Sequence, residues 1–317
     1  MAVQRKKILV TILPLGDEQV NALRAQAGDG YDLVYKRTGV TEADVADASI
    51  IVGSVNPGLL AHAPKLEWLQ LSTAGADPYL KPGVFPAGCA LTTATGAYGL
   101  AVSEHMLALT FALLRRLNQY IGQQGEGAWR SLGDVNSVEG STVLVMGLGN
   151  IGGDYARKVN ALGAHVIGLR RHVGEKPDYI DELHTNADLD NLLPRADIVA
   201  MVLPGGPETA HIMDERRLRL MKRGAYIINV GRGSAIEPNA LKKVLREGYL
   251  AGAALDVTEP EPLPADDELW RMKNVIITPH VAGHFFLHET VNRIAKIAGE
   301  NLRAWTRGEA LRNRVKI

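Results

Sequence analysis

Residues 142–152, Thr142-Val143-Leu144-Val145-Met146-Gly147-Leu148-Gly149-Asn150-Ile151-Gly152, place three spaced glycines directly after an apolar run. The spacing G-x-G-x-x-G between a strand and a helix is typical of a dinucleotide-binding turn. Gly147 would permit a tight turn, Gly149 would let the backbone approach a pyrophosphate, and Gly152 would allow the helix to pack closely on the strand. The pyrophosphate is expected over Asn150 and Ile151, where the free N–H groups of the helix N-terminus favour negative charge. A plain glycine-rich turn is the alternative, but the flanking segments favour the dinucleotide.

Short apolar runs alternate with amphipathic stretches on both sides of this loop. The strands predicted before it are Lys7–Leu13, Asp32–Tyr35, Ser49–Gly53, Leu66–Leu71 and Ala90–Thr93. The strands predicted from the loop onward are Thr142–Met146, His165–Leu169, Ile198–Leu203, Tyr226–Val230, Gly252–Asp256 and Val275–Thr278. Such alternation indicates parallel sheets with helices on both faces. The predicted fold class is α/β, with two doubly wound parallel-sheet domains (Rossmann/flavodoxin-like) and a cleft between them.

The length of 317 residues is that of about two domains. The chain makes one parallel unit, then a complete second one, and then a last helix that must pack somewhere. We therefore predict a substrate-binding domain of residues 1–98 plus 285–317 and a dinucleotide-binding domain of residues 99–284. The helix predicted at Gly99–Leu117 is strongly apolar, and Asn118–Glu139 resembles a loop or arm without a core of its own. These features predict a homodimer held through residues 99–139.

Charge and cysteine content exclude several classes of protein. Lys+Arg and Asp+Glu both number 35, so no excess of cations is available for a nucleic acid. No apolar run approaches the length of a membrane span. The single cysteine, Cys89, excludes a disulfide framework within the chain and is consistent with a cytoplasmic location. His280, His284 and His288 have helical spacing, but Pro279 and Gly283 interrupt a helix there, so no metal site is predicted.

Three charged segments follow three of the later predicted strands. Arg232 comes after the first of these strands, Glu259 and Glu261 after the second, and His280 after the third. In a doubly wound sheet, ligands bind beyond the carboxyl ends of the strands, so these side chains are expected at one crevice. Taken singly, each has a simpler interpretation, as a surface cation, a solvated loop acid or a capping residue.

Together with the glycine loop, these segments resemble the D-isomer-specific 2-hydroxyacid dehydrogenases. The resemblance runs from Leu69 to the final helix and is looser before that. Within the family, the glyoxylate/hydroxypyruvate reductases are the most similar. Besides the loop, the shared motifs are Ser72-Thr73-Ala74-Gly75-Ala76-Asp77, Asn229-Val230-Gly231-Arg232-Gly233, Asp256-Val257 with Glu261-Pro262, and Thr278-Pro279-His280.

The resemblance implies the roles of the catalytic and substrate-binding residues. His280 would be the acid/base, Glu261 its carboxylate partner with Glu259 as the fallback, and Arg232 the residue that binds the substrate carboxylate and polarises its carbonyl. Reduction of a 2-keto acid needs a proton on the carbonyl oxygen, which a histidine oriented by a carboxylate can give. Ala74 and Gly75 would offer N–H groups to the substrate carboxylate, with a plain turn as the alternative.

The same resemblance implies a set of cofactor contacts. Besides the glycine loop, the expected contacts are Leu203, Pro204, Thr209, Val230, Gly231, Arg232, Asp256, His280 and Gly283. Among these, Asp256 is expected near the nicotinamide ribose or carboxamide.

The choice of nicotinamide is predicted from the end of the second strand of this unit. NAD-specific folds place an acidic residue there to bind the ribose 2′-hydroxyl. Here Arg170 and Arg171 follow Leu169, and no carboxylate occurs until Glu175. Arginines suit a 2′-phosphate, so we predict a preference for NADPH, with NADH possible. Solvated strand-end cations are the simpler alternative.

The sequence therefore predicts an NAD(P)H-dependent enzyme that interconverts a small 2-keto acid, of the glyoxylate or hydroxypyruvate class, and its D-2-hydroxy acid. Two alternatives are a dinucleotide-sensing, corepressor-like binding protein and a phosphoglycerate dehydrogenase. Against the latter, Gly53-Ser54-Val55-Asn56-Pro57-Gly58 lacks a cation for a substrate phosphate.

Overall fold

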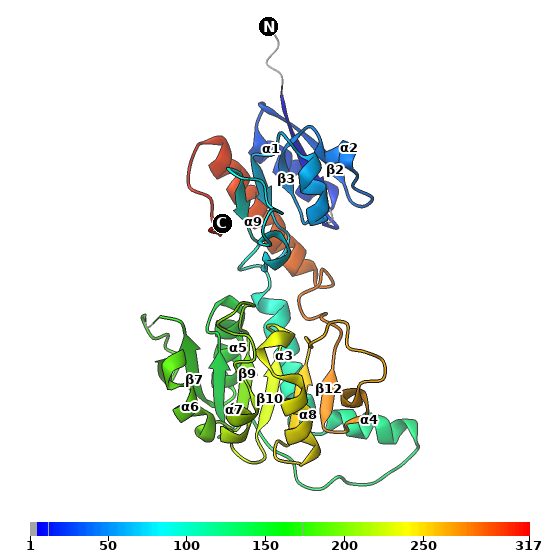
Figure 1. Cartoon of the computed structure of the whole chain (residues 1–317), viewed down its shortest axis with the longest axis vertical. Helices are drawn as coiled ribbons and strands as arrows, with labels where there is room; N and C mark the ends of the chain where they lie inside the picture. Colours follow the sequence, from blue (N-terminus) through cyan, green and yellow to red (C-terminus); the bar gives the residue numbers. More distant parts are fainter. Residues whose placement is uncertain (1–4, 12, 173) are drawn as a thin grey trace. The chain divides into compact units, whose positions relative to one another are not determined.

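The computed structural model describes residues 5–11, 13–172 and 174–317, and these form two compact units (Figure 1). The terminal unit holds the residues up to Tyr98 together with His284–Ile317, and the central unit holds Gly99–Gly283. The terminal unit is thus built from two separate stretches of chain, and the central unit is inserted between them.

The terminal unit contains a sheet of five parallel strands. In sheet order they are β2 (Tyr31–Lys36), β1 (Lys6–Thr11), β3 (Ala48–Val52), β4 (Trp68–Gln70) and β5 (Ala90–Thr92). The order 2-1-3-4-5 is that of flavodoxin-like folds. All five residues of β3 are buried, as expected for a central strand covered on both faces.

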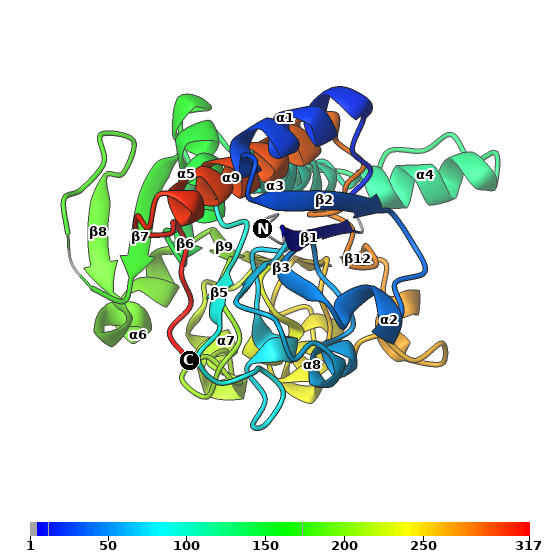
Figure 2. The same cartoon turned by 90° about the horizontal axis from the view of Figure 1, so that it is seen from above.

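Helices from both ends of the chain cover this sheet. They are α1 (Asp17–Ala27), α2 (Glu42–Val45) and α9 (His288–Thr306), with short 3-10 turns at Pro57–His62 and Asp77–Tyr79. α9 lies alongside α1 (Figure 2). The Trp305 ring stacks on buried Trp68 with ring centroids 5.5 Å apart, and Asn301 Nδ2 donates to Gln70 Oε1 at 2.7 Å. The helix α9 is therefore part of the core of the terminal unit.

The central unit contains a sheet of seven parallel strands. In sheet order they are β12 (Val275–Ile277), β11 (Gly252–Leu255), β10 (Tyr226–Asn229), β9 (Ile198–Met201), β6 (Thr142–Met146), β7 (His165–Arg170) and β8 (Glu182–Thr185). Counted from β6, this is the doubly wound order of dinucleotide-binding folds with one strand added at the edge. The order reverses between β6 and β9, so a ligand is expected beyond the carboxyl ends of these two strands.

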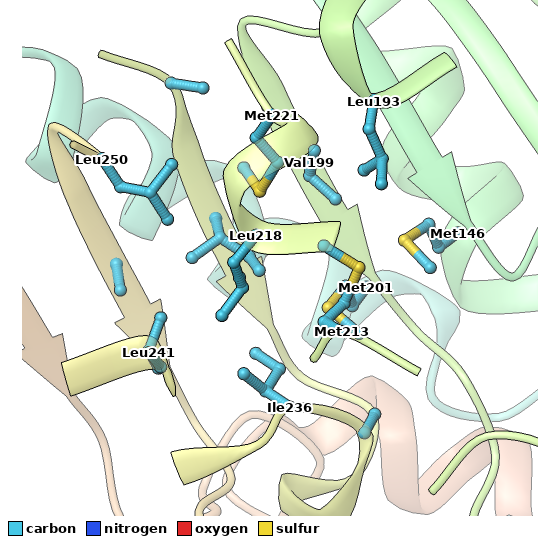
Figure 3. Close-up of a cluster of buried hydrophobic side chains, with 14 of the residues drawn as sticks. Met146, Leu193, Val199, Met201, Met213, Leu218, Met221, Ile236, Leu241 and Leu250 are labelled. Carbon is cyan, nitrogen blue, oxygen red and sulfur yellow. The ribbon is translucent and has the colours of Figure 1, made fainter. Parts of the chain in front are cut away.

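Helices cover both faces of the central sheet. They are α3 (Gly99–Leu114), α4 (Leu117–Gly125), α5 (Asn150–Ala161), α6 (Leu189–Leu192), α7 (Glu215–Leu220) and α8 (Pro238–Arg246), with 3-10 turns at Asn186–Asp188, Leu193–Arg195, Gly233–Ala235 and Glu268–Arg271. α3 packs against α5 and contacts β10 and β11. Figure 3 shows part of one buried cluster, to which the strands β6 and β9 contribute Met146 and Met201. Leu218 of α7, Leu241 of α8 and Met221, which directly follows α7, belong to the same cluster. Within the described residues, no helix is long and apolar enough to cross a membrane.

The strand β8 and the helix α4 are among the elements that differ from the sequence predictions. The strand β8 was not predicted, because its four residues are only half-buried and carry no apolar alternation. The helix α4 occupies part of the segment predicted as a loop or arm. Its two glycines are poor helix formers, and it leaves Leu117 and Ile121 exposed.

Candidate active site

The glycine loop connects β6 to α5 in the way the three glycines require. Gly147 has a φ of 98°, and a Cβ there would lie 2.6 Å from the Val202 carbonyl oxygen. A Cβ at Gly152 would lie 2.2 Å from the Gly147 carbonyl oxygen, so the helix could not approach the strand with any side chain. A Cβ at Gly149, by contrast, would meet no atom within 4 Å. The first and third glycines are fixed by packing, and the second faces open space.

The N-terminus of α5 fits a pyrophosphate. Its N-cap is Gly149, which supplies no side-chain oxygen to the first N–H groups of the helix. Those donors, at Asn150 and Ile151, lie at the switch between β6 and β9. Uncapped N–H groups and the helix dipole favour an anion at this point. The residues present can therefore hold the cofactor that the loop predicts.

The two arginines at the end of β7 have different partners. Arg170 Nη1 donates to the Glu175 carbonyl oxygen at 3.1 Å, so the acceptor in this bond is a neutral backbone group and not a carboxylate. Arg171 Nη2 forms an ion pair at 2.8 Å with Glu208 Oε2, and both side chains are exposed. Glu208 belongs to the loop after β9, and so this ion pair connects loops that follow the two neighbours of β6.

Arg232 lies three residues beyond the end of β10, on a turn held by Asn229. The buried Asn229 side chain accepts from the Gly231 N–H at 3.0 Å and donates to the Arg232 carbonyl oxygen at 2.9 Å. Arg232 Nη1 in turn donates to the Gly231 carbonyl oxygen at 2.8 Å. The backbone that carries the guanidinium is therefore fixed by a side chain buried in the strand below it.

His280 and Glu261 form a hydrogen-bonded pair. His280 Nδ1 lies 2.5 Å from Glu261 Oε1, and both side chains are about half exposed. Glu259, the fallback partner, pairs instead with His211, whose Nε2 lies 2.5 Å from Glu259 Oε2. The pairing through Nδ1 directs the other ring nitrogen of His280 away from Glu261, so Nε2 remains for a substrate.

The family follows from comparisons with known proteins. A family model described as D-isomer specific 2-hydroxyacid dehydrogenase, NAD binding domain, matches residues 107–282. Glyoxylate reductase from Korarchaeum cryptofilum is 33% identical over 271 residues, which cover 82% of this chain and 79% of that protein. The chain belongs to the D-isomer-specific 2-hydroxyacid dehydrogenase family. It is accordingly an oxidoreductase with a nicotinamide-binding central unit.

Solved structures of this dehydrogenase family extend the similarity to both units. A family member from Aeromonas salmonicida is 31% identical with a TM-score of 0.85, and the alignment covers 99% of each chain. An NADPH-dependent glyoxylate/hydroxypyruvate reductase from Sinorhizobium meliloti, solved with NADP and sulfate, is 28% identical with a TM-score of 0.82 and 98% coverage of each chain.

In this dehydrogenase, the segment that carries His280 is held by Asp256. The carboxylate is 2% exposed and accepts from the Thr278 hydroxyl at 2.6 Å, the Val281 N–H at 3.0 Å and the Ala282 N–H at 3.1 Å. His105 Nε2, on α3, lies 3.0 Å from Thr278 Oγ1. The expected place of Asp256 beside the nicotinamide stays a prediction, and both of its oxygens accept hydrogen bonds from this segment. Its visible role is to hold the strand end from which His280 projects.

The remaining cofactor candidates of the dehydrogenase line two adjacent loops. Thr209 Oγ1 donates to the Pro204 carbonyl oxygen at 2.7 Å and closes the loop after β9. A Cβ at Gly231 would lie 2.6 Å from the Leu203 carbonyl oxygen, so the loops after β9 and β10 are in contact. The structure thus brings Leu203, Pro204, Thr209, Val230 and Gly231 together. Gly283 is the last residue of the central unit.

Ala74 and Gly75 belong to the terminal unit, on the loop after β4. The Thr73 hydroxyl donates to the Gly75 carbonyl oxygen at 2.7 Å. Within the described residues, the N–H groups of Ala74 and Gly75 donate to no protein oxygen. A turn with two such donors can bind an anion.

Sequence reasoning missed three residues at this site. Asn229, His105 and His211 all bond to segments that carry predicted site residues, but none has a local pattern that reveals its partner. His105 and Thr278 are 173 positions apart, and His211 and Glu259 are 48 apart. Asn229 was part of a quoted motif, and its buried position at a strand end was the one available signal. The described residues hold no cluster of three metal-ligating side chains.

Proposed function

We propose that this chain is a cytoplasmic, NADPH-preferring reductase of small 2-keto acids, of the glyoxylate or hydroxypyruvate class, that forms the D-2-hydroxy acid. The observation that carries the proposal is the 2.5 Å His280–Glu261 pair at the carboxyl edge of the nicotinamide-binding sheet. The names of the Korarchaeum and Sinorhizobium proteins support the substrate class.

The acid/base chemistry follows from the two ring nitrogens of His280. Glu261 accepts from Nδ1–H, which fixes the tautomer and the orientation of the ring. Nε2–H then donates its proton to the carbonyl oxygen as the carbonyl becomes a hydroxyl. The reduced nicotinamide, when bound, supplies the hydride for the carbonyl carbon. A hydride and a proton together convert the 2-keto acid into the 2-hydroxy acid.

Arg232 is proposed to bind the substrate carboxylate and to polarise the carbonyl. A guanidinium presents two parallel N–H donors that match the two oxygens of a carboxylate. Its position on the Asn229-held turn gives it the fixed geometry that such recognition needs. The donors of Ala74 and Gly75 are proposed to bind the same carboxylate. The terminal unit would thus be the substrate-binding domain and the central unit the dinucleotide-binding domain.

The preference for NADPH rests on the end of β7. Arg170 follows the strand where an acid would bind the ribose 2′-hydroxyl, and its visible bond is to a backbone carbonyl. A 2′-phosphate can therefore engage its charge without first displacing a carboxylate. Arg171 would have to exchange Glu208 for the phosphate, so we assign Arg170 as the main reader and Arg171 as the second.

A substrate panel tests the proposal. Purified protein is mixed with NADPH or NADH and with glyoxylate, hydroxypyruvate, a bulky 2-keto acid or a phosphorylated 2-keto acid, and loss of reduced-nicotinamide absorbance is followed. The expected result is turnover of the two small acids with a higher kcat/KM for NADPH. Cofactor binding without turnover of any 2-keto acid would indicate a binding protein of the corepressor kind instead.

We also propose that the protein is a homodimer through residues 99–139. α3 is largely buried against its own unit, so the support comes from exposed apolar side chains at its end and beyond. These are Phe111, Leu117, Ile121, Trp129 and Val135. Trp129 is fully exposed and Ile121 is 68% exposed, which is costly for side chains of this size unless a second copy covers them. Light scattering should show a dimer, and Ile121→Asp should give a monomer.

A further inference from the structure

A second histidine–glutamate pair lies on the loop that carries Glu261. Glu259, two residues earlier, accepts from His211, with Glu259 Oε2 and His211 Nε2 2.5 Å apart. The side chains are 47% exposed at His211 and 40% at Glu259, nearly the same as in the His280–Glu261 pair. Two carboxylates of the loop after β11, those of Glu259 and Glu261, are therefore each bonded to a histidine from a different segment.

Both histidines adopt a backbone conformation that favours glycine. His211 has a φ of 47° and His280 a φ of 52°. Only four non-glycine residues of the described chain have a positive φ, and these two histidines are half of them. A residue with a Cβ has a higher energy in this left-handed backbone conformation than in the common ones. The conformation therefore persists only where other contacts hold it. The shared conformation indicates that contacts hold the backbone of His211 in place.

The backbone of His211 is joined to the turn that carries Arg232. The His211 N–H donates to the Ser234 carbonyl oxygen at 2.7 Å. On the other side of that turn, a Cβ at Gly233 would lie 1.9 Å from the Thr258 carbonyl oxygen, so the Arg232 turn packs directly on the residue before Glu259. His211 thus bonds to the Arg232 turn through its backbone and to the Glu261 loop through its ring.

We propose that His211 and Glu259 are a positioning pair that holds the Glu261 loop in register with the Arg232 turn. The inference rests on the proposed function, in which Glu261 orients His280 and Arg232 binds the substrate. His211 would act through Glu259 on the place of Glu261, and neither residue of the pair would touch the substrate or transfer its proton. This adds two positioning residues to the site without adding a chemical step.

The exposure of the pair separates a positioning role from a structural one. A half-exposed ion pair contributes little to stability, because water screens it. A misplacement of 1 Å in an active site can nevertheless lower the rate roughly 100-fold. Loss of the pair should therefore change kcat much more than it changes thermal unfolding.

Kinetics of paired variants test the inference. His211→Ala and Glu259→Ala should each lower kcat with glyoxylate about 10-fold, because Glu261 is no longer held at His280 Nδ1. The double variant should be no slower than either single one, since the two residues act as a unit. His211→Gln can still donate from its amide nitrogen and should recover most of the lost rate. The NADPH dissociation constant, measured by fluorescence, should stay unchanged in all of them.

The chain offers a matched control at the other edge of the same sheet. His165 Nε2 lies 2.8 Å from Glu182 Oε1, with 45% and 29% of the two side chains exposed. His165→Ala should leave kcat unchanged. If His211→Ala does not fold, His211→Gly removes the same side chain in a backbone conformation that suits glycine.

Three results would overturn the inference. These are a kcat of His211→Ala or His211→Gly equal to that of His165→Ala, single-variant effects that multiply in the double variant, and no recovery in His211→Gln. Failure of the proposed function is a different outcome, because His280→Ala would then keep its turnover. An inactive His280→Ala beside a fully active His211→Ala would reject only the positioning role.

Discussion

The seven-stranded sheet has an amino edge, where its parallel strands begin, and a carboxyl edge, where they end. Both edges carry histidine–glutamate pairs, but the surroundings of the pairs differ. At the amino edge, Glu182 accepts from His165, His184 and Arg195. At the carboxyl edge, Glu259 and Glu261 each bond to one histidine, and within the described residues neither has an arginine or lysine partner. Arg195, followed by His165, holds the pKa of Glu182 at about 2, so that carboxylate stays ionised whatever its histidines do.

The difference shows what makes a histidine–glutamate pair available for chemistry. At the amino edge the histidines are strand residues, and a permanent cation already satisfies the carboxylate. At the carboxyl edge the histidines lie in loops with positive φ, and each carboxylate is bonded to one imidazole. Residue type alone does not distinguish the two sites. The two sites are distinguished by the end of the strands at which they lie and, within the described residues, by whether the glutamate has an arginine or lysine partner.

Removing the acid/base should have the largest effect. His280→Ala is expected to lower kcat about 10²- to 10⁴-fold, because the carbonyl oxygen loses its proton donor. His165→Ala, at the amino edge, should leave kcat unchanged. Steady-state rates with glyoxylate and NADPH measure both, and fluorescence titration should show unchanged NADPH binding. A fully active His280→Ala variant would remove the distinction between the edges.

Removing the guanidinium at the carboxyl edge should have the next largest effect. Arg232→Gln is expected to lower kcat/KM about 100-fold, because charge-assisted hydrogen bonds to the substrate carboxylate are lost. The loss should appear in both KM and kcat, since Arg232 acts on bound substrate and on the transition state. Arg195→Gln serves as the arginine control from the amino edge. An effect confined to KM would mean that Arg232 binds substrate without polarising it.

The two ends of β7 provide a comparison within one strand. Arg170→Asp, at the carboxyl end, should lower the ratio of kcat/KM for NADPH to that for NADH about 10-fold, because the 2′-phosphate would face a carboxylate. His165→Asp, at the amino end, should leave the ratio unchanged. Measurement of both cofactors with one substrate gives the ratio directly. Equal values for the two cofactors in the unmodified protein would show that neither arginine reads the phosphate.

The smallest expected effect concerns stability at the amino edge. Because the pKa of Glu182 is lowered in the folded chain, its ion pairs stabilise the fold above the ordinary glutamate pKa, and this stabilisation is lost as pH falls toward about 2. Arg195→Gln should lower the melting temperature only slightly near neutral pH, because water screens this exposed ion pair, and should make stability less sensitive to acid. Thermal unfolding over a series of acidic pH values tests this. Equal acid sensitivity of both proteins would contradict it.

Much of the fold could be predicted because its signals are local. The glycine loop and the β6 strand were predicted at the positions where the structure has them. β8 could not be predicted, since a half-buried edge strand needs no apolar face. α4 could not be predicted either, because a helix with two glycines and exposed Leu117 and Ile121 has little local preference to reveal it.

The candidate site was predictable where strand ends reveal it. Arg232, Glu261 and His280 each follow a strand, and parallel strands end at one edge. His211 and His105 were not predictable, because each takes its role from a partner far away in the sequence. The resemblance selected Glu261 over Glu259, but the pairing of Glu259 with His211 needed the structure, because only the fold brings those two residues together.

Because the terminal unit is built from two separate stretches of chain, its elements leave the ribosome at different times. The strands β1 to β5 emerge first, but α9, which stacks Trp305 on Trp68, emerges last. Between Tyr98 and Gly283 the ribosome adds 283 − 98 = 185 residues. At about 5–20 residues per second this takes about 10–40 seconds, during which the first five strands lack a helix of their core. The inserted unit can fold on the nascent chain, whereas the terminal unit cannot complete its core until α9 has been made.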